Sequence, residues 1–221
     1  PSRLFPYKGN AVFRSGWDDR AVLVYRAGPN FNHTHIDQGN FRFWALGREL
    51  IGEAERGSYY SDPYYWSYFI QPAGHNCLLV DGNPESQFVG DFRNEIAAFD
   101  NYARLTDHLV TSPVCMVASE LAAVYRADLE TYSRRIWFAD PGYLVIRDHA
   151  RAADGPHAWQ FQLHAPEGGK LQICAVDQAV IDADEVYLNI SALAPEGAEL
   201  LVKDQPFSNH DYEDDPDRPP R

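Results

Sequence analysis

Short apolar and aromatic runs recur along almost the whole chain, and turn-forming residues separate them. The runs are residues 21–27, 40–46, 76–80, 132–138, 143–147, 158–164, 171–176 and 186–190. Gly, Pro, Asn or Asp fill most of the gaps. Many short strands at near-regular spacing predict an all-β protein, an antiparallel β-sandwich of many strands with little helix. The best helical candidate, residues 120–130, has no clear caps and fits a strand equally well.

The length of 221 residues suits one large domain or two small ones. We expect residues 1–203 to form the sandwich and residues 204–221 to form an acidic, Pro-rich loop or tail. Sandwiches usually end in a strand, and this chain begins Pro-Ser-Arg without an initiator Met. Both ends are therefore consistent with a piece cut from a longer protein.

The net charge of −13 argues against binding to nucleic acid and to anionic membrane surfaces. The sequence contains neither a signal peptide nor a run of 18 apolar residues. The three cysteines form no CxxC pair, and we expect Cys77 and Cys174 to be buried because they lie in apolar runs. The aromatic content of 14% suits sugar binding, although all-β cores are also rich in aromatics.

The densest group of chemically active side chains lies in residues 32–40. In an extended chain, His33, His35 and Asp37 point to one face because successive side chains alternate. Two imidazoles and a carboxylate on one face suit metal ligation or acid–base chemistry. A polar strand edge with two hydrogen-bonded histidines is the alternative.

Two later segments add a carboxylate and a third imidazole. Glu53 ends the strand-like run Leu50-Ile51-Gly52-Glu53, and His75 precedes the apolar run 77–80. A His, a carboxylate and a His from neighbouring strands form a known set of ligands for Zn²⁺ with an open position. The alternative is a hydrogen-bonded His/Glu/His cluster.

The order of these motifs resembles the C-terminal domain of the heparinase II/III and alginate lyase group. The pattern is H-x-H-x-D-x-G at 33–39, a Leu-Ile run ending in an acid, Gly-Ser-Tyr at 57–59, and His-Asn ahead of LLVDG at 78–82. Residues 15–28 resemble the entry strands of that domain, and residues 135–148 and 159–164 resemble its later core strands. The resemblance covers roughly residues 5–165.

The resemblance implies a polysaccharide lyase that cleaves a 4-linked uronic acid by β-elimination. It makes His33 a catalytic residue and Tyr59 an active-site tyrosine, with Tyr60 as the alternative register. It also implies one structural zinc ion, with the ligands His35, Glu53 and His75. Glu53 stands where the family usually has Asp. The alternative for Tyr59 and Tyr60 is an aromatic strand in a Tyr-rich stretch.

Lyases of this family also carry an N-terminal (α/α) toroid, which forms the other wall of the active site and which this chain lacks. The resemblance therefore implies three things: an acidic polysaccharide substrate, the helical toroid as a partner domain of the same protein, and a periplasmic or secreted location. The negative charge disfavours heavily sulfated chains and favours a carboxylated glycan such as alginate. The alternative function is a non-catalytic carbohydrate-binding or metal-stabilised structural β-sandwich.

Overall fold

The computed structural model describes residues 2–17, 21–30, 34–54, 62, 64–88, 102–139 and 142–203. The N-terminal strands form a five-stranded antiparallel meander. These strands are β1 (Arg3–Phe5), β2 (Asn10–Arg14), β3 (Ala21–Arg26), β4 (Phe41–Ala45) and β5 (Arg48–Ile51). In β2, β3 and β4, buried and half-buried residues alternate strictly. This period of two buries one face of the sheet and leaves the other open.

A second antiparallel meander has the strand order β10-β9-β8-β7. Its strands are β7 (Arg104–Val110), β8 (Val114–Glu120), β9 (Leu129–Ala139) and β10 (Tyr143–Ala152). The central strands β8 and β9 bury every second residue over most of their length, whereas β7 and β10 lie at the edges of the sheet and are more exposed.

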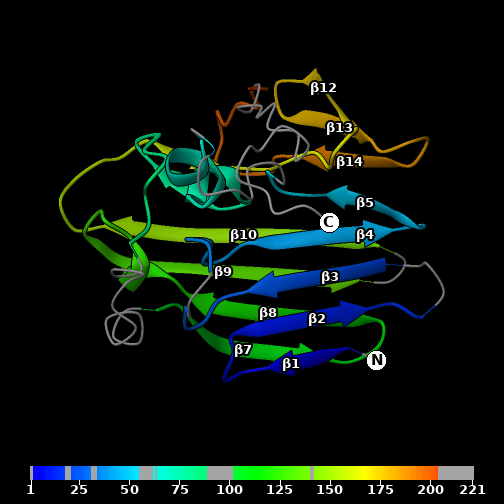
Figure 1. Cartoon of the computed structure of the whole chain (residues 1–221), viewed down its shortest axis with the longest axis horizontal. Helices are drawn as coiled ribbons and strands as arrows, with labels where there is room; N and C mark the ends of the chain where they lie inside the picture. The colour runs from blue at the N-terminus through cyan, green and yellow to red at the C-terminus, as the bar shows by residue number, and fades with distance from the viewer. Residues whose placement is uncertain are drawn as a thin grey trace, which may run out of the picture.

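The two meanders stack face to face, with β1–β5 in front of β7–β10 in Figure 1. Their inner faces share one apolar core, in which the rings of Phe13 and Phe138 have centroids 6.4 Å apart. A buried hydrogen bond between the Tyr25 and Ser119 hydroxyls also joins the sheets. The predicted antiparallel β-sandwich is therefore confirmed.

The remaining strands form two small sheets. Strand β6 (Leu78–Val80) pairs with β11 (Trp159–Phe161), and β12 (Lys170–Ala175), β13 (Gln178–Asp182) and β14 (Tyr187–Ser191) form a three-stranded sheet. This last sheet lies beyond β5 in Figure 1. The described helices are short: one π-helical turn, η1 (Tyr65–Phe69), and two 3₁₀ turns, η2 (Pro72–Gly74) and η3 (Ala122–Val124). None of the described helices is long and apolar enough to cross a bilayer.

Two local expectations need correction. The helical candidate at 120–130 has only the three-residue turn η3 as helix, while Glu120 ends β8 and Leu129 begins β9. In the Tyr-rich stretch, residues 65–69 form η1, whereas Tyr59 and Tyr60 lie outside the described residues. Cys77 is buried as expected, but Cys174 is exposed. The apolar run around Cys174 forms β12, where the register shifts between Ile173 and Ala175, so Cys174 lies at a bulge of an edge strand.

Candidate functional site

The segment that carries the H-x-H-x-D-x-G motif is a turn, not a strand. No residue from 34 to 40 is in a strand, so the extended conformation that we expected is wrong there. His35 lies against His75, whereas Asp37 forms an ion pair with Arg26 (Nε to Oδ1, 2.9 Å). His33, Tyr59 and Tyr60 lie outside the described residues.

His35, Glu53 and His75 come together because three segments end at the same edge of the sandwich. His35 precedes β4, Glu53 follows β5, and His75 precedes β6. The Nδ1 atom of His35 lies 3.2 Å from Nε2 of His75. The Nδ1 atom of His75 lies 2.7 Å from Oε2 of Glu53. The three side chains therefore form a continuous hydrogen-bonded chain with His75 in the middle.

The surroundings of these three side chains determine which of them are charged. Burial alone would raise the pKa of Glu53, but the hydrogen bond and charge of His75, the amide of Asn40 and the charge of Arg42 lower it to about 2. Glu53 is thus a carboxylate, and His75 Nδ1–H is the donor of the hydrogen bond between them. Burial, followed by the proximity of His75, lowers the pKa of His35, which favours a neutral imidazole.

The expected zinc site can be compared with the spacing of these side chains. His35 Nδ1 and His75 Nε2 are 3.2 Å apart, close to the roughly 3.3 Å between two nitrogens on one tetrahedral zinc with Zn–N of about 2.0–2.1 Å. Glu53 instead binds the other nitrogen of His75, where a carboxylate commonly orients a zinc-bound histidine. Among the described residues, no group of three His, Cys, Asp or Glu side chains is arranged to hold a metal ion.

Two asparagines hold these segments in place. The fully buried amide of Asn76 donates to the carbonyls of Phe41 (2.7 Å) and Gly52 (2.6 Å) and accepts from the backbone N–H of His164 (2.8 Å). Asn40 accepts from the Asn76 backbone N–H (3.0 Å) and donates to Glu53 Oε2 (2.7 Å). The residue after His75 therefore ties together the start of β4 and the end of β5.

A phenol and a third imidazole lie beside Asn76. The Tyr68 hydroxyl is 3.4 Å from Nε2 of His164, which also lies 3.1 Å from the Ala73 carbonyl. Burial lowers the pKa of His164 to about 4 and raises that of Tyr68 to about 12. At neutral pH both groups are therefore uncharged, and Tyr68 retains its proton.

Sequence reasoning missed Asn40, Asn76 and His164, and also Arg134 of β9, whose Nη1 donates to the carbonyls of Gly39 and Asn76. Asn40 and Asn76 nevertheless lie inside the quoted motifs. The only sequence signal for Asn40 and Asn76 was their position, because each lies next to or within a motif that carries a histidine. Arg134 and His164 carried no such signal, since they are 99 and 129 residues away from His35 in sequence, respectively. Their roles become visible only in the folded chain.

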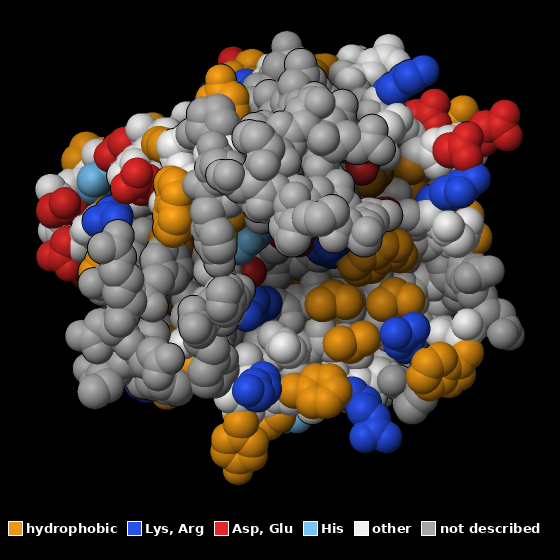
Figure 2. Space-filling view, viewed as in Figure 1, with side chains coloured by type: hydrophobic (Ala, Val, Ile, Leu, Met, Phe, Trp, Pro, Cys, Tyr) orange, Lys and Arg blue, Asp and Glu red, His pale blue; other side chains and the backbone are white. Residues whose placement is uncertain are grey.

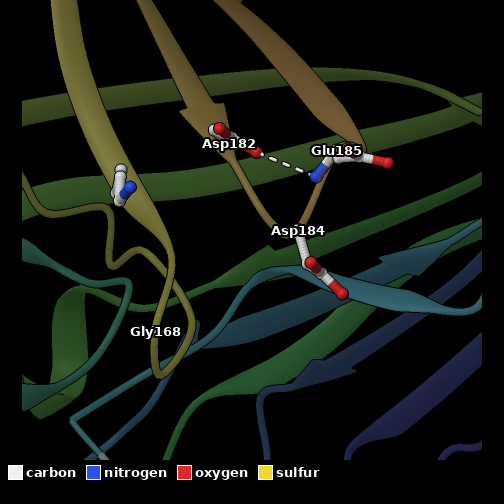
Figure 3. A pocket seen from close by; sticks show the side chains of 5 residues that line it. Gly168, Asp182, Asp184 and Glu185 are labelled. Carbon is white, nitrogen blue, oxygen red and sulfur yellow. Dashed lines mark hydrogen bonds between the residues drawn. The ribbon is translucent and has the colours of Figure 1, made fainter.

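Two surface hollows lie elsewhere. One, shown in Figure 3, is lined by Gly168, Lys170, Asp182, Asp184 and Glu185 on the small β12–β14 sheet. Asp182 accepts a hydrogen bond from the Glu185 backbone N–H (3.1 Å), and Asp184 pairs with Arg48. A second hollow is lined by residues near Val176 and Leu193. Neither hollow is lined by His35 or His75.

The comparison with known families decides the assignment. Residues 1–204 match the family described as Heparinase II/III-like, C-terminal. The chain belongs to this family. This is the family that the order of motifs indicated. No match to a curated protein was found.

Two solved structures have a similar fold. The BT4657 gene product, a heparinase III, matches with a TM-score of 0.70 and 19% identity over 89% of this chain and 29% of that chain. Another heparinase III crystal structure matches with a TM-score of 0.58 and 16% identity over 86% of this chain and 33% of that one. At these identities the similarity establishes the fold, and the chain spans only about a third of either protein.

Proposed function

We propose that this domain forms one wall of the active site of a polysaccharide lyase, within a longer protein that also carries a helical toroid. The observation that carries the proposal is the gathering of His35, Glu53 and His75 at one edge of a heparinase II/III-like sandwich. The edge lies directly beside residues 31–33 and 55–61 in sequence, so His33 and Tyr59 or Tyr60 are attached to the same segments.

The proposed reaction is β-elimination at a 4-linked uronic acid. A base removes the C5 proton, the C4–O bond breaks as the C4–C5 double bond forms, and an acid protonates the leaving oxygen. The C5 proton becomes acidic only when the neighbouring carboxylate is neutralised, which requires donors that converge on it. We assign His33 to this catalytic group, with Tyr59 or Tyr60 as the proton-transferring phenol.

His35 and His75 have a supporting role in this proposal. A zinc ion bound to their facing nitrogens would crosslink the 34–40 turn to the entrance of β6, with Glu53 holding the second nitrogen of His75. The zinc would be structural, so it contributes to folding and not to the elimination itself.

The outer face of the β1–β5 sheet supports an acidic glycan as substrate. Arg3, Val12, Val24 and Arg42 lie in register in one row across β1–β4. Figure 2 views this face, where hydrophobic and Lys or Arg side chains gather while acidic side chains lie mainly at the ends of the molecule. The Arg42 guanidinium lies 5.0 Å from the Trp44 ring centroid and 3.4 Å from Glu53.

Arginine forks match carboxylates, and ring faces suit the apolar faces of sugars. Arg3 and Arg42, at the two ends of this row, therefore give the face positive charge despite the net charge of −13, although Arg42 also pairs with Glu49 (2.7 Å). We favour a weakly sulfated uronan such as alginate. By family resemblance we expect the full-length protein to be periplasmic or secreted.

The test is turnover by the full-length protein on a panel of uronans, followed by absorbance of the C4–C5 double bond. We expect activity on at least one uronan, and a decrease in kcat of about 10²-fold or more for His33→Ala. Glu185→Gln, in the exposed turn between β13 and β14, is the control. A full-length protein that binds uronans without producing unsaturated ends would instead be a non-catalytic carbohydrate-binding sandwich.

A further inference from the structure

A buried arginine on the opposite sheet contacts both segments of the histidine site. Arg134 is the bulkiest fully buried side chain of the described residues and lies on β9. Its Nε donates to Asp148 Oδ1 (2.8 Å) and its Nη2 to Asp148 Oδ2 (2.6 Å), a bidentate pair between β9 and β10. The guanidinium centre also lies 4.9 Å from the ring centroid of Phe161 and 5.9 Å from that of Phe41.

The remaining nitrogen of the guanidinium points at the site. Nη1 donates to the carbonyl of Gly39 (2.7 Å) and to the carbonyl of Asn76 (2.6 Å). Gly39 ends the turn that carries His35, and Asn76 directly follows His75. One planar group therefore joins the His35 segment, the His75 segment and the second sheet, using four of its five donors.

We propose that Arg134 is a positioning residue, which sets the separation of His35 and His75 through these two carbonyls. Its importance for catalysis rests on the function proposed above. A buried ion pair is weak evidence for stability, since apolar residues often replace such a pair at no net cost. A hydrogen bond to two carbonyls from separate loops is a geometric constraint that apolar residues cannot supply.

Lysine would not substitute for Arg134. Its ammonium is a point charge, whereas the guanidinium presents donors along fixed directions in one plane. An ammonium that stays beside Asp148 gives up at least one of the two carbonyls. Arg134→Lys therefore preserves the buried charge pair and removes the double tether.

The first test uses the 221-residue chain. Proton NMR follows how fast the His75 Nδ1 proton, which is donated to Glu53, exchanges with solvent. The variant is R134M/D148N, which removes both charges. The new amide oxygen still accepts from the Tyr132 hydroxyl, which lies 3.2 Å from Asp148 Oδ2 in the wild type. We expect the His75 proton to exchange with solvent at least about tenfold faster while unfolding remains cooperative. The matched control is Arg135→Met, at the next and exposed position of β9, which should leave the exchange unchanged.

The second test measures kcat and KM in the full-length lyase. We expect R134M/D148N and Arg134→Lys to lower kcat about tenfold or more with KM within about threefold, because small misplacements of catalytic groups have large effects on rate. Arg134→Lys alone decides the question if the double variant does not fold. Folded variants with wild-type proton exchange and wild-type kcat would overturn the proposal. An inactive wild-type enzyme would contradict the proposed function, while the NMR result would still decide whether Arg134 positions the histidines.

Discussion

His35 and Glu53 bind opposite nitrogens of one imidazole, that of His75. The distances are 3.2 Å from His35 Nδ1 to His75 Nε2 and 2.7 Å from His75 Nδ1 to Glu53 Oε2. The extra methylene of glutamate, relative to the aspartate expected for this family, lets the carboxylate reach the far side of the ring. The carboxylate therefore orients His75, and the two facing nitrogens remain as the pair that we propose to bind zinc.

We predict that the purified chain binds about one equivalent of zinc. His35→Ala and His75→Ala should abolish binding because each removes one of the facing nitrogens. Glu53→Gln should weaken zinc affinity by roughly 10–100-fold, the usual effect of losing the carboxylate that orients a ligating histidine. Elemental analysis and competition with a chelator measure both effects. Less than about a tenth of an equivalent in the wild type would contradict zinc binding and leave the hydrogen-bonded cluster.

We predict that Asn76→Ala destabilises the chain by about 3 kcal/mol or more. The substitution leaves the carbonyls of Phe41 and Gly52 without their donor in the buried region, at roughly 1–3 kcal/mol for each. Urea unfolding gives the free energy. Asn189→Ala, at an exposed position of β14, should change it by less than about 0.5 kcal/mol. Equal effects of the two substitutions would show that the Asn76 amide does not hold the strands.

The strands and the members of the cluster could be predicted from the sequence. Short apolar and aromatic runs placed β3, β4 and β9 and the first half of β10, which continues to Ala152, because such runs are a local property of the sequence. The motif order brought together His35, Glu53 and His75, which the structure places in contact. The choice between a zinc site and a hydrogen-bonded cluster stays a prediction, which the zinc measurement above tests.

The turn at 34–40 could not be predicted, because distant residues determine it. The backbone N–H of Gln38 donates to Gln87 Oε1 (2.9 Å), and Gln87 Nε2 donates back to the Gln38 carbonyl (2.8 Å) across 49 residues. Arg134 was equally hidden, since arginine is almost never fully buried unless it is paired. Its partner Asp148 lies 14 residues away on another strand.

We predict that Gly39→Ala is more harmful than Gly47→Ala. Both glycines have positive φ, +86° and +75°, so both substitutions force an L-residue into the left-handed region at about 1–2 kcal/mol. A Cβ at Gly39 would also lie 3.0 Å from Cδ1 of the fully buried Leu121, whereas nothing lies within 4 Å at Gly47. In chemical denaturation, the free energy of unfolding of Gly39→Ala should be at least about 1 kcal/mol lower than that of Gly47→Ala. Equal stabilities would mean that Leu121 moves freely out of the way.

We predict that the free energy of unfolding falls as the pH decreases from 6.5 to 4, in part through His164. The pKa of His164 is about 4 in the folded protein, against an ordinary value of 6.5 for the unfolded chain. Above pH 6.5 both states are neutral and His164 contributes nothing. Below pH 6.5 the unfolded state takes up a proton that the folded state does not. This lowers the free energy of unfolding by roughly 2 kcal/mol at pH 5.

Other groups titrate in the same range, so the measurement is a comparison with His164→Gln. The hydrogen bonds that the His157 ring donates to Asp154 and Asp81 raise the pKa of His157. The stability that these bonds provide is lost in the opposite direction, as the pH rises. Denaturant midpoints at pH 7.5 and 5 should therefore differ less in His164→Gln than in the wild type. An identical pH dependence in both proteins would show that His164 is not held neutral.

The last prediction is that the 221-residue chain alone has no measurable lyase turnover. A base near C5 gains its rate from a substrate held in near-attack geometry, an effect of roughly 7–11 kcal/mol. This chain supplies one wall of the proposed groove, and most groups that neutralise the uronate carboxylate would lie on the other. The assay is the absorbance of unsaturated uronate ends on alginate, heparan sulfate and other uronans. The chain together with the separately produced N-terminal portion is the positive control. Robust turnover by the isolated chain would show that the other wall is dispensable, and that the residues at the His35–His75 edge complete the site by themselves.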